Sequence, residues 1–349
     1  METKVITVDK TAPDGELMKE AGQVLKDGGL VAFPTETVYG LGGDALDAQA
    51  SQKIYAAKGR PSDNPLIIHI ADWEHLSAIV REIPEAAKKL ADAFWPGPLT
   101  MIFNKSDLVP METTGGLTTV AVRMPDHPVA RDLIRYGGGY VAAPSANTSG
   151  RPSPATAEHV KDDLMGKIDM IVDGGHVGIG LESTIVDLTS DTPVILRPGY
   201  VNQQMLEEVL GKVEMDRGLI AADSHIKPKA PGMKYRHYAP KGNLVIVEGE
   251  QDAVISWIEA KSREYAEEGY KVGVIGTDET VDSYSTGFVR SIGSRQQEES
   301  IACHLFDVLR EFDDLGASYI FSESFDTPKM GQAIMNRLLK AAGHQVVRV

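Results

Sequence analysis

Short apolar runs alternate with amphipathic stretches through most of this chain, and the alternation is interrupted once. Residues 14–29 carry apolar side chains at helical spacing, and Leu30 to Phe33 follow as a short apolar run. Apolar residues three or four apart favour a helix, whereas a brief apolar run between turn residues favours a strand. A chain of such alternating units is expected to fold as a sheet covered by helices.

The N-terminal two thirds predicts an α/β fold, with an open sheet partly covered by helices. Helices are expected at residues 14–29, 48–57, 84–94, 128–136, 156–164 and 202–210. Strands are expected at residues 30–33, 65–70, 99–103, 119–124, 140–143, 170–173, 183–188 and 194–197.

The pattern weakens between Gly211 and Gly242 and then resumes. The expected organisation is therefore a domain at residues 1–211, a linker at 212–242 and a smaller domain at 243–349. In the last part, strands are expected at residues 244–247, 272–275, 319–322 and 345–349, and helices at 252–266, 299–315 and 331–342. This spacing favours a small Rossmann-like layer domain. It has no G-x-G-x-x-G turn, so no dinucleotide site is expected there.

Composition excludes several classes of protein. The single cysteine, Cys303, allows neither an intramolecular disulfide nor a Cys-rich zinc site, and we expect a buried structural thiol. The net charge of −15 argues against nucleic-acid binding as the main role, since such binding usually needs a basic face. The chain shows no apolar run of about 18 residues and no signal-peptide core, so a cytoplasmic protein without a membrane role is expected.

Five polar segments follow or flank the expected strands. They are residues 34–42 after the first strand, 58–65 with Lys58 and Arg60, 119–128 with Arg123, 142–153 with Ser145 and Asn147, and 181–199 with Ser183 and Arg197. Taken singly, each also fits a structural role, such as a polar turn, a solvated helix end, a surface salt bridge or a core histidine at His69. Together, hydroxyls and cations at the strand ends of one domain are typical of a site for an anionic ligand.

The same segments carry a joint resemblance to a known family. The chain contains P-T-E-T-V-Y-G-L-G, K-G-R-P-x-x-N-P-L-I-x-H, W-P-G-P-L-T, V-A-V-R-M-P, A-P-S-A-N, E-S-T-I-V-D and L-R-P-G in this order. This set, over residues 15 to 200, resembles the threonylcarbamoyl-AMP synthase family of the YrdC type. The later A-P-G-M-K-Y-R-H-Y-A-P (Ala230 to Pro240) resembles the linker of its longer, two-domain members.

The resemblance implies a YrdC-type twisted open sheet, α+β in character, and an adenylyl-transfer reaction. L-threonine and bicarbonate or CO₂ give a carbamate, which attacks the α-phosphate of ATP to form L-threonylcarbamoyladenylate and pyrophosphate. A separate tRNA threonylcarbamoyl-transferase complex then modifies adenosine 37 of tRNAs that read codons beginning with A. Mg²⁺ is expected with the ATP phosphates, where negative charge is concentrated; no metal-binding residue is assigned.

The resemblance also implies roles for individual residues. Lys58 and Arg60 are the expected catalytic cations. The residues expected at ATP are Lys58, Arg60, Ser62, Thr119, Ser145, Asn147, Ser153 and Arg197. Those expected at L-threonine are Thr35, His69, Arg123, Ala143 and Ser183, with Arg123 near the carboxylate. A candidate lid that excludes water comprises Lys234, Tyr235, His237 and Tyr238.

Three alternatives stay open at this point. The chain could bind double-stranded RNA or tRNA, which its acidity disfavours as a primary role, although a tRNA contact is compatible with the enzyme. It could be a carbamoyl-transfer maturation factor of the hydrogenase type, although those proteins carry Cys-rich zinc modules. It could also be a non-catalytic ligand-binding module, which the joint set of motifs disfavours.

Overall fold

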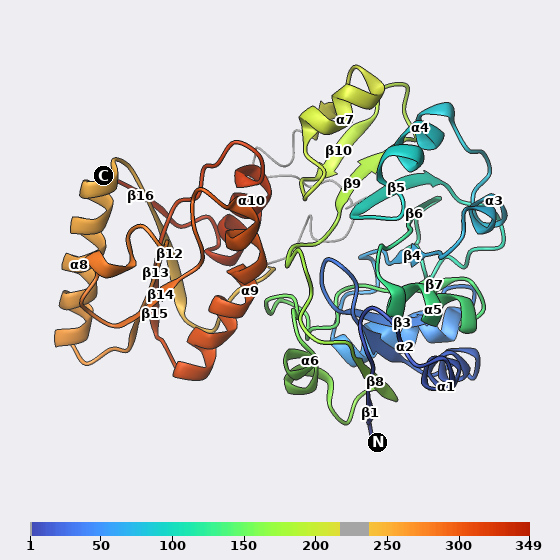
Figure 1. Cartoon of the computed structure of the whole chain (residues 1–349), viewed down its shortest axis with the longest axis horizontal. Helices are drawn as coiled ribbons and strands as arrows, with labels where there is room; N and C mark the ends of the chain where they lie inside the picture. The colour runs from blue at the N-terminus through green and yellow to red at the C-terminus, as the bar shows by residue number, and fades with distance from the viewer. Residues whose placement is uncertain (1, 217–236) are drawn as a thin grey trace. The chain divides into compact units, whose positions relative to one another are not determined.

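The computed structural model describes residues 2–216 and 237–349. The chain divides into two compact units, which are described separately. Of the described residues, unit 1 comprises 2–149, 153–178 and 182–216, and unit 2 comprises 150–152, 179–181 and 237–349. Figure 1 shows that each unit is built on its own sheet.

Unit 1 is organised by an 11-stranded mixed sheet of order β1-β8-β2-β3-β7-β4-β6-β5-β9-β10-β11. Its strands are β1 (Lys4–Thr7), β2 (Val31–Phe33), β3 (Gly40–Asp44), β4 (Ile67–His69), β5 (Leu99–Asn104), β6 (Thr119–Arg123), β7 (Val141–Ala142), β8 (Met170–Asp173), β9 (Thr184–Asp187), β10 (Val194–Arg197) and β11 (Glu214–Met215). Strand β4 pairs in parallel with β6, and β6 pairs antiparallel with β5. β11 falls inside the stretch expected to be a linker.

Helices cover this sheet unevenly. They are α1 (Gly15–Lys26), α2 (Ala48–Lys58), η1 (Trp73–His75), α3 (Leu76–Ile79), α4 (Glu85–Phe94), α5 (Pro128–Tyr136), α6 (Ala157–Leu164) and α7 (Gln203–Leu210). The carboxylate of Asp14 caps α1 by accepting from the backbone N–H groups of Glu16 and Leu17. α1 and α5 pack closely, because Gly22 leaves room for the backbone of Tyr136.

Strand alternation separates the core of unit 1 into two faces. In β7, Val141 belongs to the cluster beneath α1 and α5, whereas its neighbour Ala142 belongs to the larger cluster with α2, α4 and α6. Successive strand residues point to opposite faces, so these clusters lie on opposite sides of the sheet. His69 is the cross-strand partner of Val141 and therefore shares the α1–α5 face.

Unit 2 contains a five-stranded parallel sheet of order β14-β13-β15-β12-β16. Its elements are β12 (Asn243–Glu248), α8 (Gln251–Glu267), β13 (Val272–Gly276), η3 (Val281–Ser283), β14 (Phe288–Ser291), α9 (Glu298–Leu315), β15 (Tyr319–Glu323), α10 (Gly331–Ala341) and β16 (Val346–Arg348). Figure 1 shows α8 on one face of the sheet and α9 and α10 on the other. Cys303 lies in α9 and is half-buried, less buried than expected.

The sequence pattern missed β1, β3 and β14. β3 reads Gly-Leu-Gly-Gly-Asp, a composition that normally disfavours strands. Its glycines are needed for close packing, since a Cβ on Gly42 would lie 2.8 Å from Val141 Cγ1 and 2.9 Å from Phe33 Cε1. Tertiary packing therefore overrides local propensity in β3.

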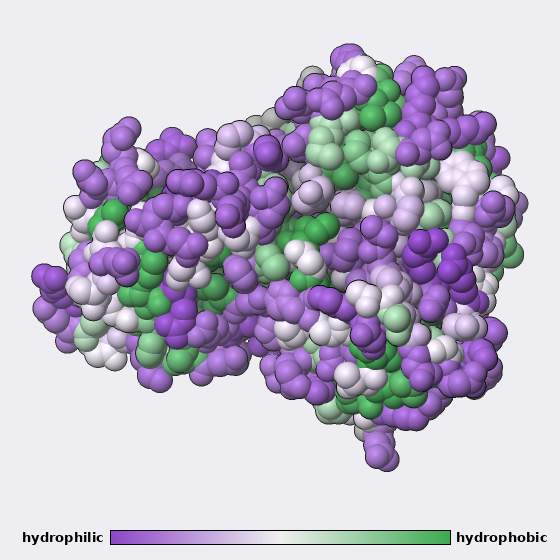
Figure 2. Space-filling view, in the orientation of Figure 1, coloured by the Kyte–Doolittle hydropathy of each residue, from purple (hydrophilic) through white to green (hydrophobic). Residues whose placement is uncertain are grey.

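Figure 2 shows hydrophilic side chains over most of the face in view. Among the described residues, the exposed large apolar side chains are Val5, Leu108, Met111, Met165, Tyr200, Tyr270 and Val349, of which Leu108 and Met111 are near neighbours in the sequence. Within residues 2–216 and 237–349, no helix combines the length and apolar character that a membrane crossing requires.

Candidate active site

Three polar residues form a row across neighbouring strands of unit 1. His69 ends β4 and Arg123 ends β6, and the two are register partners. Thr100 of β5 is the register partner of Arg123 on its other side. Cross-strand partners project from the same face of a sheet. The row therefore lies on the face of the sheet that α1 and α5 cover.

Arg123 is buried and its guanidinium is fixed from three directions. Nε donates to the carbonyl of Gly97 at 3.3 Å, and Nη1 donates to Thr37 Oγ1 at 2.9 Å. Nη2 lies 2.7 Å from Glu36 Oε1. This last contact is an ion pair without hydrogen-bond geometry, so Nη2 has no hydrogen-bond acceptor among the described residues. A buried guanidinium with an unsatisfied N–H is suited to receiving a carboxylate.

Burial, and secondarily the neighbouring Arg123, lower the pKa of His69 to about 3. The carbonyls of Ile67 and Val141 act in the opposite direction but more weakly. His69 Nδ1 is 3.1 Å from the carbonyl of Ile67. His69 is therefore a neutral side chain at neutral pH, so it adds no second cation beside Arg123.

Hydroxyl groups contact the row at its middle and at its Thr100 end. Thr35 Oγ1 lies 2.9 Å from Thr37 Oγ1 and donates to the carbonyl of Val38 at 2.7 Å. Ser183 Oγ lies 2.7 Å from Thr100 Oγ1. Arg197 donates to Ser183 twice, from Nε to the carbonyl at 3.0 Å and from Nη2 to Oγ at 3.2 Å. Hydrogen bonds thus connect Thr35 to Arg123 through Thr37. They also connect Arg197 to Thr100 through Ser183.

A second group of expected residues surrounds the C-terminal end of α2. Lys58 is 2% exposed, and its ammonium donates to the carbonyls of Ser145 and Asn147. The hydroxyl of Ser145 donates to the side-chain carbonyl of Asn147. A Lys this deeply buried must have its charge satisfied. These contacts hold the loop after β7 in one conformation.

Backbone hydrogen bonds join the two groups. Gly40 and Ser145 form an isolated antiparallel bridge, and Ala146 N donates to the carbonyl of Tyr39 at 2.8 Å. Tyr39 N donates to the carbonyl of Pro154 at 2.9 Å. Next to Pro154, Ser153 Oγ donates to Glu182 Oε1 at 2.5 Å. The loops that carry Thr35, Ser145 and Ser153 therefore meet around Tyr39.

The remaining expected residues have other surroundings. Arg60 is buried and donates within its own loop, to the carbonyls of Asn64 at 3.3 Å and Pro65 at 3.2 Å. Ser62 is exposed in that loop. Ala143 is buried, and its N–H donates to the carbonyl of Ile67 at 2.9 Å. Thr119 begins β6, so about 13 Å of strand separates it from Arg123 at the other end.

Two of the four candidate lid residues, Lys234 and Tyr235, lie outside the described residues. His237 and Tyr238 are described and belong to unit 2. Tyr238 is buried with a φ of 63°, and its ring stacks on Phe306 with centroids 5.1 Å apart. The lid stays a prediction.

The motifs also contain four residues to which the sequence alone assigns no role: Glu36, Thr37, Thr100 and Glu182. Glu36 and Thr37 hold the guanidinium of Arg123, Thr100 orients Ser183, and Glu182 accepts from Ser153. Their positions within the polar segments were the available signal. The contacts themselves depend on strand register, which the motifs do not specify.

The fold and the candidate site define a class of protein: a two-unit α/β protein whose larger unit buries an arginine and a lysine near the ends of its strands and helices. Residues 23–199 match the family model described as Telomere recombination, and residues 201–343 match the one described as Threonylcarbamoyl-AMP synthase, C-terminal domain. The chain belongs to the threonylcarbamoyl-AMP synthase family, in its two-domain form.

Individual relatives agree with this assignment. A threonylcarbamoyl-AMP synthase of Bacillus subtilis (strain 168) is 49% identical over 352 residues, covering 100% of both chains. One of Pyrococcus abyssi is 48% identical over 347 residues, covering 99% of this chain and 100% of the relative. The crystal structure of P. abyssi Sua5 complexed with L-threonine matches with a TM-score of 0.95 at 48% identity, covering 99% of this chain and 100% of that one. The expected fold class, family and enzyme class are thereby confirmed.

Proposed function

We propose that unit 1 carries out threonylcarbamoyl-AMP synthesis with the row His69–Arg123–Thr100 as its threonine site and the Lys58 loop as its ATP site. The observation that carries this proposal is the buried guanidinium of Arg123, whose Nη2 makes an ion pair with Glu36 but no hydrogen bond to a described residue, beside a neutral histidine and several hydroxyls. Such surroundings suit a carboxylate and a small polar side chain. P. abyssi Sua5 was crystallised with L-threonine, a ligand of that description.

Threonine binding would use the fixed orientation of Arg123. Its guanidinium has five N–H donors, of which two are engaged by Gly97 and Thr37 and one faces Glu36. The carboxylate of threonine would complete the contacts of Nη2, while Thr35 and Ser183 supply hydroxyls and Ala143 lines the pocket. Because His69 remains neutral, the carboxylate would meet one cation rather than two.

The nucleotide would extend from the Lys58 loop to Arg60 in the neighbouring loop and to Arg197, which contacts Ser183. Lys58 and Arg60 supply positive charge, and Ser145, Asn147, Ser153 and Arg197 supply donors, with Ser62 and Thr119 further out. A carbamate oxygen of the threonine adduct attacks the α-phosphorus, the bond to the bridging oxygen breaks, and pyrophosphate leaves. The chain supplies positioning and charge stabilisation, because the substrates provide both nucleophile and leaving group.

Mg²⁺ would accompany ATP and shield its phosphates. Among residues 2–216 and 237–349 there is no group of three or more His, Cys, Asp or Glu that could hold a metal ion. Mg²⁺ commonly binds through substrate phosphates, waters and only one or two carboxylates. Glu182, beside Ser153, is the carboxylate in this group of loops that fits such a role.

The product would pass to the tRNA threonylcarbamoyl-transferase complex, in the cytoplasm, for modification of adenosine 37. The predicted contact with tRNA or double-stranded RNA belongs to the same proposal. A net charge of −15 makes such a contact local rather than general.

Pyrophosphate release by the full chain with Mg-ATP tests the proposal. Release should require both L-threonine and bicarbonate. Arg123→Lys should raise KM for threonine and lower kcat/KM about ten- to a hundredfold, the loss expected for one charge-assisted hydrogen bond. Lys58→Met should instead act on ATP and lower kcat. Equal effects of both variants on both substrates would contradict the two separate subsites.

Lys105→Met is the matched control for Lys58→Met. Lys105 also donates to a backbone carbonyl, that of Val109 at 2.8 Å, but it follows the end of β5 remote from Thr100. Lys105→Met should therefore leave pyrophosphate release unchanged.

Salt-dependent RNA binding by a chain that never turns over ATP would favour the RNA-binding alternative.

A further inference from the structure

Unit 2 contains a topological switch point that the proposed reaction does not use. Strands β12 and β15 are neighbours in the parallel sheet. The chain leaves β12 for α8 on one face and leaves β15 for α10 on the other, as Figure 1 shows. Two connections that diverge from adjacent parallel strands leave a crevice at the carboxyl ends of the strands. Open α/β sheets bind ligands at this position.

A cavity of about 240 Å³ lies at this crevice. Gly249 and Gln251 line it after β12, and Glu323, Ser324 and Asp326 line it at the end of β15 and beyond. Arg295 contributes from the segment before α9. The volume suits a single small metabolite.

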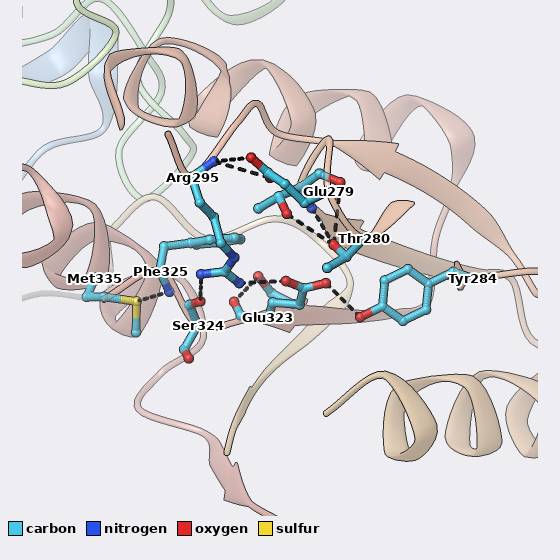
Figure 3. Close-up of polar contacts among 10 residues, drawn as sticks. Glu279, Thr280, Tyr284, Arg295, Glu323, Ser324, Phe325 and Met335 are labelled. Carbon is cyan, nitrogen blue, oxygen red and sulfur yellow. Dashed lines mark hydrogen bonds and ion pairs between the residues drawn. The ribbon is translucent and has the colours of Figure 1, made fainter. Parts of the chain in front are cut away.

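The cavity is lined by an oriented ion pair between the buried Glu323 and the partly exposed Arg295, drawn in Figure 3. Glu323 is 2% exposed, and its Oε2 accepts from Arg295 Nη2 at 2.6 Å. Its other oxygen accepts from the hydroxyl of Tyr284 at 2.8 Å. Arg295 Nη1 donates to the carbonyl of Ser324 at 3.1 Å. Burial of the Glu323 carboxylate costs desolvation free energy, so an oriented ion pair at a cavity is weak evidence for stability and a candidate for ligand binding.

Arg295 is also held at its backbone. Its N–H donates to both carboxylate oxygens of Glu279, at 3.0 and 3.2 Å, and Ser294 Oγ donates to the same carboxylate at 2.6 Å (Figure 3). The guanidinium lies 5.4 Å from the ring centre of Phe325. Its side chain is nevertheless 32% exposed. The guanidinium uses two of its five N–H groups in the bonds to Ser324 and Glu323. The other N–H groups can still donate to a carboxylate.

The charges around the cavity select the ligand class. Arg295 and Glu323 neutralise each other, which leaves Asp326 as the remaining charge of the lining. Glu250 and Asp252 add negative charge where α8 begins. This negative charge would repel a free phosphate, which brings no cation of its own, and the turn also lacks a glycine-rich phosphate loop. A zwitterion differs from a phosphate because its ammonium can meet Asp326 and offset the repulsion of its carboxylate. A ligand with both an ammonium and a carboxylate is favoured instead.

We propose that this cavity is a second ligand site, which binds a free α-amino acid. The carboxylate of the ligand meets Arg295 and the backbone N–H groups at the start of α8, and its ammonium meets Asp326. The site lies wholly within unit 2, so it is independent of the threonine subsite proposed for unit 1.

Calorimetric titration of the full-length Arg123→Met chain with each proteinogenic L-amino acid tests this site. The Arg123→Met background weakens threonine binding in unit 1. At least one amino acid should bind with one-to-one stoichiometry, and its decarboxylated amine and its N-acetyl form should bind at least about tenfold more weakly, since each lacks one charged contact. Hydrogen exchange should slow at residues 249–251 and 323–326.

Asp326→Asn is the decisive variant, because Asp326 is exposed and the change is isosteric. It should weaken binding about tenfold or more while leaving unchanged the pyrophosphate release measured with L-threonine as the sole amino acid. Asp282→Asn, an exposed aspartate of η3 outside the lining, should have no effect. Any one of three results would overturn the proposal. The first is amino-acid binding that Asp326→Asn does not weaken, and the second is no binding by any amino acid at millimolar concentration. The third is binding of inorganic phosphate or AMP at this cavity.

Discussion

His69 should make the stability of unit 1 depend on pH. Burial and then Arg123 hold its pKa at about 3 in the folded chain, whereas an unfolded histidine titrates near about 6.5. The folded state therefore binds fewer protons than the unfolded state between these values. The contribution is complete above about pH 6.5 and is lost as the pH falls towards about 3.

The magnitude follows from the difference between the two pKa values. At about pH 5 the unfolded histidine is almost fully protonated and the folded one is not, so the free energy of unfolding should fall by about 2 kcal/mol relative to neutral pH. His69→Gln has no titrating ring and should lose this component. His176→Gln removes an exposed histidine of the same unit and should leave the pH dependence intact.

Urea unfolding at the two pH values measures this effect. Two of the three tryptophans, Trp73 and Trp95, lie in unit 1, so a Trp257→Phe background makes fluorescence report on unit 1. The wild-type loss between neutral pH and about pH 5 should exceed that of His69→Gln by about 2 kcal/mol. Equal losses, or an NMR titration of the His69 ring near pH 6.5, would refute the burial argument.

Three further substitutions test the packing of unit 1 by thermal or urea unfolding. Gly22→Ala should lower the free energy of unfolding by about 1–3 kcal/mol, because the new Cβ would lie 2.5 Å from Tyr136 Cβ. Gly15→Ala is the control and should be nearly neutral, because its Cβ would meet only the Tyr136 hydroxyl at 3.9 Å. Similar losses in the two variants would disprove the close approach at Gly22. Asp14→Ala should cost about 1 kcal/mol through loss of the α1 cap, and an unchanged midpoint would show that the cap is not needed. Tyr39→Phe should lower the free energy of unfolding by about 1–3 kcal/mol, since the hydroxyl accepts from the N–H of Gly174 and donates to the carbonyl of Gly175. An unchanged free energy of unfolding would contradict that pairing.

Much of the fold was predictable because element type depends on local periodicity. The expected helix at residues 128–136 and the expected strands at 170–173 and 194–197 match α5, β8 and β10 residue for residue. The exceptions are instructive. β3 is glycine-rich because the side chains of Phe33 and Val141 occupy the space beside it, a constraint that no local pattern records.

The sequence by itself determined where apolar faces lie, where helices begin and end, and which polar segments follow strands. These properties depend on neighbours a few residues away. Only the tertiary structure decided that β4, β6 and β5 are adjacent, and hence that His69, Arg123 and Thr100 stand in one row. The pairing of Arg123 with Glu36 and the switch point between β12 and β15 were decided in the same way. The physical reason is that strand order and register are set by long-range packing and backbone hydrogen bonding, which join segments far apart in the chain.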